Sequence, residues 1–341
     1  MTLLTNTELD ELGVCEVVSA YFVEPPRHVK PCDDGIINTT YLLQFNDGRQ
    51  CILQQLNTLF DEATVTDFQA VSTHLAQRGR IVQRLIPTIG NKPCYRDSAG
   101  NLWRALSYIA GTEAPEHMTE SQLVSVGKLL GGLHESLSSF TYKPTFTIPN
   151  FHDTGFYART LGTIRKQVLD PALQRMADDC LAAHTYLELP PAPMQLIHGD
   201  PRTTNIVFDT HTELASCYID FDTLMYGSPW VDIGDLIRSI SGNSDQTQEK
   251  FSIGSVQAIM QGYILARPQI APAHEEALRL SLTSLQVISI ELTIRFLIDT
   301  VQDYYFGWDN TLFQSRKDNN IARANAQLAI YRKATEYLSG I

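Results

Sequence analysis

Two short motifs in the second half of the chain constrain its fold more than any other feature. The first motif is Ile197–Asn205, with the sequence IHGDPRTTN, and the second is Tyr218–Asp222, with the sequence YIDFD. Between them, Ile206–Phe208 and Ser216–Ile219 are rich in β-branched and aromatic residues and predict two strands, and Asp209–Thr212 has the composition of a turn. The pattern therefore predicts a loop followed by a hairpin, with an Asp and an Asn in the loop and a further Asp after the returning strand.

These residue types suit the transfer of a phosphoryl group from ATP. A carboxylate on a loop can orient and deprotonate an attacking hydroxyl, and Asp200 suits that role, with His198 making structural hydrogen bonds in the loop. Mg²⁺ prefers hard oxygen ligands, which Asn205 and Asp220 supply, with Asp222 as an auxiliary ligand. The spacing from Asp200 to Asn205 also equals that between the base and the metal-binding Asn of the protein-kinase catalytic loop. The sequence thus predicts an enzyme that uses ATP and Mg²⁺.

The two motifs resemble the signatures of the aminoglycoside phosphotransferase and choline kinase superfamily, namely His-Gly-Asp-x4-Asn and Ile-Asp-Phe/Trp-Asp. This resemblance implies a two-lobed, protein-kinase-like α+β fold with ATP between the lobes and a small-molecule hydroxyl as acceptor. The segment Asp34–Tyr41 is similar to the superfamily's Gly-x-x-Asn-x-x-Tyr loop, where a glycine lets peptide N–H groups approach phosphate oxygens. The nucleotide contacts expected from this loop are Gly35, Asn38 and Thr39.

The lobes are expected at residues 1–109 and 110–341, joined near Tyr108–Gly111, where the backbone of Tyr108 and Ile109 would meet the adenine. Strand patterns dominate the first lobe, with one helix over Ala63–Arg78. The predicted strands are Val14–Val23, Thr39–Phe45, Gln50–Leu56, Ile81–Ile86 and Leu102–Ile109. Apolar residues recur at helical spacing after Gly111, which predicts helices over 123–137, 155–168, 171–186, 230–240, 246–266, 272–302 and 319–338.

The third predicted strand departs from the kinase pattern. Ile52–Gln54 stands where kinases have two apolar residues and a lysine that pairs with the phosphates, and Gln54 carries no charge. Arg84, Lys92 or another cation could replace the lysine, or the chain could be a degenerate kinase that binds nucleotide without catalysis. The intact catalytic and metal motifs favour an active enzyme. The helix carboxylate that would partner such a lysine is Glu62 or Asp67.

Further segments resemble a narrower family, the N-acetylhexosamine 1-kinases and their relatives. These segments are Gly35–Tyr41, Ile52–Thr58, Leu85–Thr88, Trp103–Arg104, Phe151–Thr154, Asp232–Arg238, Glu291–Asp299 and Tyr305–Phe306. The resemblance implies that Arg295 and Tyr305 line the acceptor pocket and that Asp232 braces the catalytic loop. Asp235 and Arg238 are residue types that could also bind sugar hydroxyls. Each pair has a structural alternative, because Asp235 with Arg238, and Glu291 with Arg295, are spaced for ion pairs on one helix.

The acceptor expected first is the hydroxyl of a sugar or amino sugar, such as an N-acetylhexosamine phosphorylated at its anomeric position. An amine alcohol of the choline, ethanolamine or aminoglycoside type is the alternative. It would need clustered carboxylates and an aromatic box around its ammonium group, and Arg295 in the pocket argues against it. A nucleotide-binding pseudokinase is the remaining alternative, and Gln54 is its only support.

Composition restricts the partners and the location. The net charge of −12 disfavours binding to nucleic acid or to an anionic membrane. Met1–Asp10 lacks the basic and apolar regions of a signal peptide, and no uninterrupted apolar stretch reaches the ~18 residues that span a bilayer. The six cysteines are scattered without a Cys-x-x-Cys pair, so we expect reduced thiols. A soluble cytoplasmic protein is expected, and its oligomeric state is left open.

Overall fold

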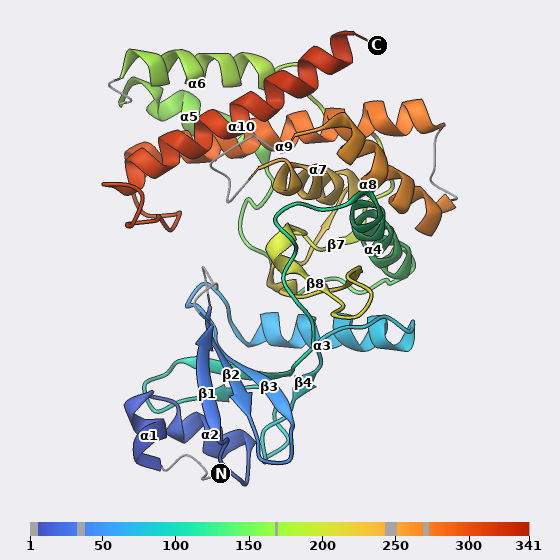
Figure 1. Cartoon of the computed structure of the whole chain (residues 1–341). Helices are drawn as coiled ribbons and strands as arrows, with labels where there is room; N and C mark the ends of the chain where they lie inside the picture. Colours follow the sequence, from blue (N-terminus) through green and yellow to red (C-terminus); the bar gives the residue numbers. More distant parts are fainter. Residues whose placement is uncertain (1–5, 33–37, 168–169, 243–250, 269–272, 341) are drawn as a thin grey trace. The chain divides into compact units, whose positions relative to one another are not determined.

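The computed structural model describes residues 6–32, 38–167, 170–242, 251–268 and 273–340 (Figure 1). Contacts among the residues divide the chain into two compact units. The strand unit comprises Met1–Gly111, Tyr142–Thr147 and Ile219–Asp222. The helical unit comprises Thr112–Thr141, Ile148–Tyr218 and Thr223–Ile341. An antiparallel sheet in the first unit and many helices in the second confirm the predicted α+β class.

The strand unit is built on one antiparallel sheet. In the described residues its strand order is β1 (His28–Cys32), β2 (Thr39–Gln44), β3 (Gln50–Gln55), β6 (Leu102–Ser107) and β4 (Leu85–Ile86), and β5 (Tyr95–Arg96) also pairs with β6. The predicted hairpin is confirmed, since β2 and β3 are joined across Asn46–Gly48. The predicted helix is α3 (Glu62–Gln77), which begins where the Asp61 side chain accepts hydrogen bonds from two backbone N–H groups.

The strand predicted over Val14–Val23 is wrong, because these residues form the helix α2 (Cys15–Tyr21), which follows α1 (Asn6–Glu11). Val14, Val17, Val18 and Tyr21 are all buried, and their spacing is that of one helix face. The β-branched side chains thus pack in the core without adopting strand geometry. The first strand is instead β1, which was not predicted and which tolerates a proline because it lies at the edge of the sheet.

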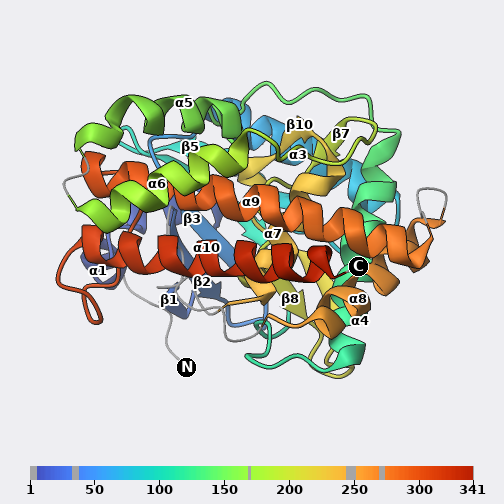
Figure 2. The ribbon, with the colours of Figure 1, turned by 90° about the horizontal axis from the view of Figure 1, so that it is seen from above.

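The helical unit contains the helices predicted after Gly111 (Figure 2). They are α4 (Glu120–Ser138), α5 (Thr154–Ile164), α6 (Pro171–His184), α7 (Pro229–Ile240), α8 (Ile253–Ala266), α9 (His274–Gln302) and α10 (Arg316–Ser339). The predicted start of the 246–266 helix lies outside the described residues. The predicted hairpin after the first motif is β8 (Ile206–Phe208) with β9 (Ala215–Tyr218). A second pair, β7 (Gln195–Ile197) with β10 (Met225–Gly227), was not predicted.

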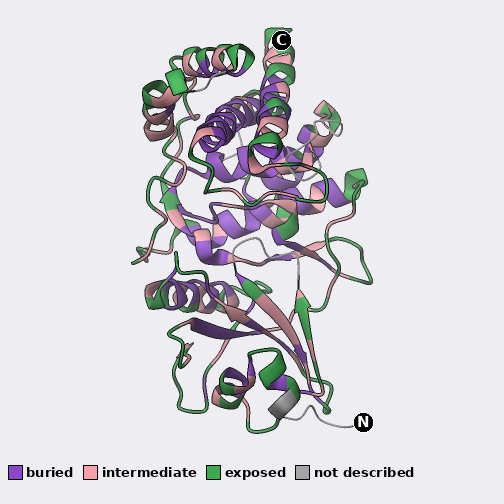
Figure 3. Cartoon of the chain, turned by 90° about the vertical axis from the view of Figure 1, so that its left-hand side faces the viewer, coloured by how far each residue is buried: buried purple, intermediate pink, exposed green. Residues whose placement is uncertain are grey.

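Helix α9 forms the core of the helical unit. An 18-residue window of this helix has a mean hydropathy of 1.4, so by length and composition alone it could cross a membrane, but 94% of that window is buried inside the protein. Helices α5, α6, α7 and α10 pack against it, and buried residues fill the interior of this unit (Figure 3). The apolar character of α9 is therefore explained by packing against other helices.

Helices α4 and α8 cross at a very short distance. A Cβ atom on Gly127 would lie 1.8 Å from the carbonyl oxygen of Ile259, and one on Gly262 would lie 1.9 Å from that of Val124. Only glycine permits this approach at both positions. The crossing fixes the spacing between two helices that supply side chains to the network around the first motif.

Candidate active site

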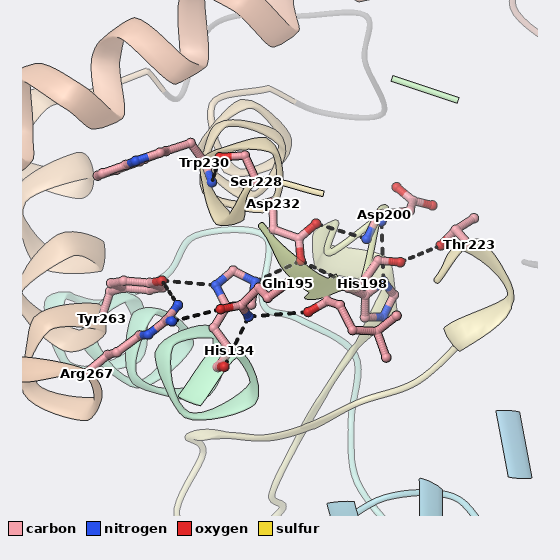
Figure 4. Close-up of polar contacts among 12 residues, drawn as sticks. His134, Gln195, His198, Asp200, Thr223, Ser228, Trp230, Asp232, Tyr263 and Arg267 are labelled. Carbon is pink, nitrogen blue, oxygen red and sulfur yellow. Dashed lines mark hydrogen bonds and ion pairs between the residues drawn. The ribbon is translucent and has the colours of Figure 1, made fainter. Parts of the chain in front are cut away.

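The loop that follows β7 is held by side chains from three other segments. The backbone N–H groups of His198 and Gly199 donate to the two carboxylate oxygens of Asp232 on α7, at 2.8 and 2.9 Å (Figure 4). Thr223 Oγ1 donates to the carbonyl oxygen of His198 at 3.0 Å, and His152 Nε2 donates to that of Gly199 at 2.8 Å. Every backbone polar group of these two residues thus has a side-chain partner, and the orientation of the next residue, Asp200, is set before any substrate binds.

The glycine of this loop is a structural requirement. Gly199 has φ +85°, and a Cβ atom there would lie 2.3 Å from the carbonyl oxygen of Thr223. A side chain would collide with that backbone, and the positive φ would add strain. The geometry therefore explains why this chain has Gly where protein kinases have Arg between the His and the Asp.

Asp232 is the end of a buried chain of hydrogen bonds. Arg267 donates to the Tyr263 hydroxyl at 3.2 Å, Tyr263 donates to His134 Nδ1 at 3.0 Å, and His134 Nε2 donates to Asp232 at 2.9 Å (Figure 4). Burial opposes ionisation of Asp232, but the hydrogen bonds from His134 and the loop outweigh it and hold its pKa below the ordinary value. Burial lowers the pKa of His134, so the ring is neutral and Asp232 is ionised. The brace predicted for Asp232 is confirmed.

Asp200 and Asn205 are brought together within the loop. Asn205 Nδ2 donates to the backbone oxygen of Asp200 at 2.9 Å and lies 3.4 Å from its Oδ2. No hydrogen bond between described residues uses the Asn205 side-chain oxygen, which makes it available as a hard ligand. Burial raises the pKa of Asp200, Arg202 opposes that rise and Asp235 adds to it. A carboxylate with a raised pKa is better suited to accept a proton than an ordinary surface Asp.

His152 links this loop to α9. Its Nδ1 lies 3.0 Å from Glu291 Oε1, and Thr154 Oγ1 donates to Glu291 Oε2 at 2.7 Å. Burial opposes protonation of His152, but the negative charge of Glu291 outweighs it and raises the pKa of His152 to about 9. This pair was not predicted from the sequence, because the two residues lie far apart along the chain.

The raised pKa of His152 predicts a pH dependence of stability. Its ordinary pKa is 6.5, so the ion pair stabilises the fold fully below pH 6.5, and this contribution is lost as the pH rises through about 9. The stability difference between the wild type and His152→Gln should therefore shrink by about 3 kcal/mol over that range. Urea unfolding at a series of pH values measures this. Replacement of the exposed His211 by Gln is the control, and a difference for His152→Gln that stays constant with pH would contradict the prediction.

The structure brings Arg295 and Tyr305 together, two residues that the resemblance assigns to the acceptor pocket. The Arg295 guanidinium donates to the Tyr305 hydroxyl at 3.1 Å. It also lies 5.1 to 5.6 Å from four aromatic ring centroids, those of Phe151, Tyr157, Tyr305 and Phe306. The ion pair that was its structural alternative is present, since Arg295 Nη1 lies 3.6 Å from Glu291 Oε1. Arg295 is thus a cation in an aromatic cage, connected through Glu291 and His152 to the Asp200 loop.

Asp235 and Arg238 form the ion pair that was the structural alternative for them. Arg238 Nε donates to Asp235 Oδ1 at 2.8 Å, and both side chains are buried. The second oxygen of Asp235 is buried and has no hydrogen-bond partner among the described residues. Because a buried acceptor without a donor is unfavourable, this oxygen is a candidate contact for a ligand hydroxyl.

In the strand unit, the partner of Gln54 is Arg104, which is neither of the two cations named from the sequence. Arg104 Nε and Nη2 donate to Gln54 Oε1 at 2.9 and 2.8 Å, and Gln54 Nε2 donates to Thr40 Oγ1 at 3.2 Å. Arg84 is exposed and donates to Thr73. The sequence thus predicted that another cation could take the place of the lysine, but it did not identify Arg104 as the cation opposite Gln54.

Neither predicted helix carboxylate faces Gln54. Glu62 pairs with Arg96 at the surface, at 3.2 Å. Asp67 is buried and accepts hydrogen bonds from the segment 142–147, including one from the Thr145 backbone at 2.9 Å. The carboxylates of α3 therefore serve other contacts in the strand unit.

Asp222 pairs with Arg104 in the interior of the strand unit. Its oxygens accept from Arg104 at 2.6 and 2.8 Å and from Asn38 Nδ2 at 2.9 Å. A carboxylate engaged in this way is a poor magnesium ligand, because the metal would have to displace a buried ion pair. Asp220, two residues earlier, has φ +62°, a left-handed conformation that Asp adopts more readily than most residues.

The other predicted nucleotide residues that the structure describes lie at or next to the ends of strands. Thr39 is exposed at the start of β2, and Tyr108 and Ile109 are half-buried just after β6. Asn38 is buried and is held by Asp222. Gly35 lies outside the described residues.

Comparison with known proteins gives one family. A sequence model described as the phosphotransferase enzyme family matches residues 28–273. Among solved structures, the chain is similar to an amicoumacin kinase in complex with AMP-PNP, Ca²⁺ and Ami (TM-score 0.66, 15% identity, 95% of this chain and 94% of that one). It is also similar to a microcompartment-associated aminopropanol kinase (0.65, 17%, 96% and 98%) and to a choline kinase from Cryptosporidium parvum Iowa II (0.61, 11%, 91% and 90%). At such identities the likeness shows a shared fold.

Proposed function

Since the chain belongs to the phosphotransferase enzyme family and is a small-molecule kinase, we propose that it transfers the γ-phosphoryl group of ATP to a hydroxyl group of a sugar or amino sugar. The observation that supports this proposal is the loop held by Asp232, in which Asp200 and Asn205 have the spacing of a phosphotransfer loop and Asn205 Nδ2 donates to the backbone oxygen of Asp200. The hydrogen bonds that hold the backbone of His198 and Gly199 restrict the orientation of the Asp200 carboxylate, as a base that must meet a hydroxyl at a fixed angle requires.

In the proposed reaction, the acceptor oxygen forms a bond to the γ-phosphorus, and the bond from that phosphorus to the β–γ bridging oxygen breaks. Asp200 takes the hydroxyl proton, and ADP leaves. Asn205 and Asp220 are the proposed magnesium ligands, and Asp222 is not, because its oxygens are held by Arg104 and Asn38. Magnesium, when bound, neutralises charge on the β- and γ-phosphates.

The surroundings of Arg295 favour a neutral acceptor over an amine. Proteins recognise quaternary ammonium groups with an aromatic cage, and here the chain's own guanidinium fills such a cage. A cationic acceptor placed there would face an unfavourable like charge. A sugar would instead find a hydroxyl donor and acceptor in Tyr305, which is 48% exposed, and an acceptor in the free oxygen of Asp235.

An N-acetylhexosamine phosphorylated at its anomeric hydroxyl remains the first choice of acceptor. The amine-alcohol alternative is ranked below it because of Arg295, and the pseudokinase alternative is ranked last because Asp200, Asn205 and Asp220 are all present. Release of ADP, followed with a coupled assay in the presence of Mg²⁺ and ATP, tests all three against separate pools of sugars, amine alcohols and aminoglycosides. Turnover with a sugar pool supports the proposal. Turnover confined to the amine pools, or none in any pool, would reject this acceptor class.

Replacement of Arg295 by leucine tests the acceptor pocket. The change removes the charge and the hydrogen bond to Tyr305, so kcat/KM for the acceptor should fall roughly 10- to 100-fold, while KM for ATP stays unchanged. Steady-state kinetics with each substrate varied in turn separates the two effects. Arg279→Leu is the matched control, since Arg279 lies on the same helix in an exposed pair with Glu276. A rise in KM for ATP without a change in kcat/KM for the acceptor would show that Arg295 does not belong to the acceptor pocket.

A further inference from the structure

The strand unit contains a buried arginine directly opposite the position of the missing lysine. Gln54 of β3 and Arg104 of β6 are register partners in the antiparallel sheet. The Arg104 side chain is only 1% exposed, and it is shared between the Gln54 amide oxygen and the Asp222 carboxylate. A cation so deep in the protein is tolerated because its charge is matched and its donors are used.

Helix α3 offers this arginine an aromatic ring in place of a carboxylate. The Arg104 guanidinium lies 5.2 Å from the ring centroid of Phe68, and Phe68 in turn packs near Phe221. The negative charge comes from Asp222 instead. The ion pair that protein kinases form between strand and helix thus has a counterpart here, formed between β6 and the segment Ile219–Asp222.

The Arg104–Asp222 pair connects the two segments that are proposed to hold nucleotide and metal. Asp222 accepts from Asn38, and Asn38 Oδ1 in turn accepts from the Asn57 backbone at 2.9 Å. Asn38 belongs to the predicted phosphate loop, and Asp222 lies two residues after Asp220. One buried cation therefore fixes the end of the loop and the end of the metal motif to the same strand.

We propose that Arg104 takes the place of the strand lysine of related kinases, with the positive charge moved from β3 to the facing residue of β6. It acts as a positioning residue. Because its side chain is buried and its contacts are with Gln54 and Asp222, it orders Asp222 and Asn38, and through them the residues that meet MgATP. This proposal rests on the proposed use of MgATP, and it does not depend on the identity of the acceptor.

The test compares variants in which the positive charge is removed from β6, returned to β3 or kept on β6. The variants are R104Q, which removes the cation, Q54K/R104Q, which returns it to β3, and R104K, which keeps it on β6. Binding of a fluorescent ATP analogue is titrated at several Mg²⁺ concentrations, so the readout needs no acceptor and stays valid if the sugar assignment fails. R84Q is the matched control, because Arg84 is an exposed cation of the same unit.

R104Q should weaken Mg²⁺-dependent binding roughly tenfold or more, since it leaves the buried Asp222 carboxylate without its positively charged partner. Q54K/R104Q should recover part of that loss, R104K most of it, and R84Q should match the wild type. Wild-type binding by R104Q, or a folded double variant no better than R104Q, would overturn the proposal. If R104Q does not fold, R104K and Q54K/R104Q are compared with the wild type instead. Binding of the analogue by both variants supports the proposal, and loss of binding in both with an intact fold overturns it.

Discussion

Replacement of Asp200 by asparagine should lower kcat on the order of 10²- to 10⁴-fold, the range that a positioned general base contributes. Asparagine keeps the size of the side chain but cannot accept the hydroxyl proton. The loop itself should persist, because Asp232, Thr223 and His152 bind the backbone of the two preceding residues. The dissociation constant for MgATP should therefore remain that of the wild type. Steady-state turnover and nucleotide titration on the same preparation measure the two quantities.

The same variant should change the pH profile. Burial raises the pKa of Asp200, and its protonated form cannot act as a base, so wild-type kcat should fall as the pH decreases through that raised pKa. The residual activity of Asp200→Asn should lack this acid limb. Asp178→Asn is the control, because Asp178 is a half-exposed surface carboxylate paired with Arg165. An Asp200→Asn enzyme with wild-type turnover would rule out the assigned role.

Replacement of Asp232 by alanine should have the largest effect on stability. Asp232 is fully buried and accepts from two backbone N–H groups and from His134. Its removal leaves three buried donors without a partner, so the free energy of unfolding should fall by about 3–5 kcal/mol. Urea unfolding measures this change. Turnover per folded molecule should also decline, because the loop that carries Asp200 loses its main support.

An exposed carboxylate provides the comparison for this variant. Asp178→Ala breaks an ion pair at the surface of α6, and such pairs contribute about 0–1 kcal/mol. If Asp232→Ala unfolds at the same urea concentration as Asp178→Ala, the buried network does not stabilise the loop. Lost turnover with unchanged stability would instead make Asp232 a contact of the substrate.

The sequence allowed the fold class and the loop that carries Asp200 and Asn205 to be predicted, because both depend on local patterns. The helix spacing after Gly111, the hairpin at Asn46–Gly48 and the loop from His198 to Asn205 are each encoded within a short stretch. The α2 segment was assigned wrongly for the same reason. Its β-branched residues indicate a strand by composition. In the structure these residues lie on one face of a helix that packs against the sheet of the strand unit, and such a contact cannot be read from local composition.

The partners of the site residues could not be predicted, because they are set by long-range contacts. His152 and Glu291 lie far apart along the chain of the helical unit. Arg104 and Asp222 are 118 residues apart. Spacing along the chain indicates only neighbours on one helix, as for Asp235 with Arg238. The sequence showed that Gln54 lacks the positive charge of the strand lysine, but the position of Arg104 opposite Gln54 follows only from the register between β3 and β6.

The identity of the phosphorylated product decides whether this protein is an anomeric sugar kinase. The purified protein is incubated with MgATP and, in separate reactions, with N-acetylhexosamines or amine alcohols, and the product is examined by ³¹P NMR, with Asp200→Asn as the control. We expect a sugar phosphate whose phosphorus couples to the anomeric proton, formed by the wild type and on the order of 10²- to 10⁴-fold more slowly by Asp200→Asn. A phosphate ester found only on an amine alcohol, or release of inorganic phosphate with no ester from any sugar, would contradict this expectation.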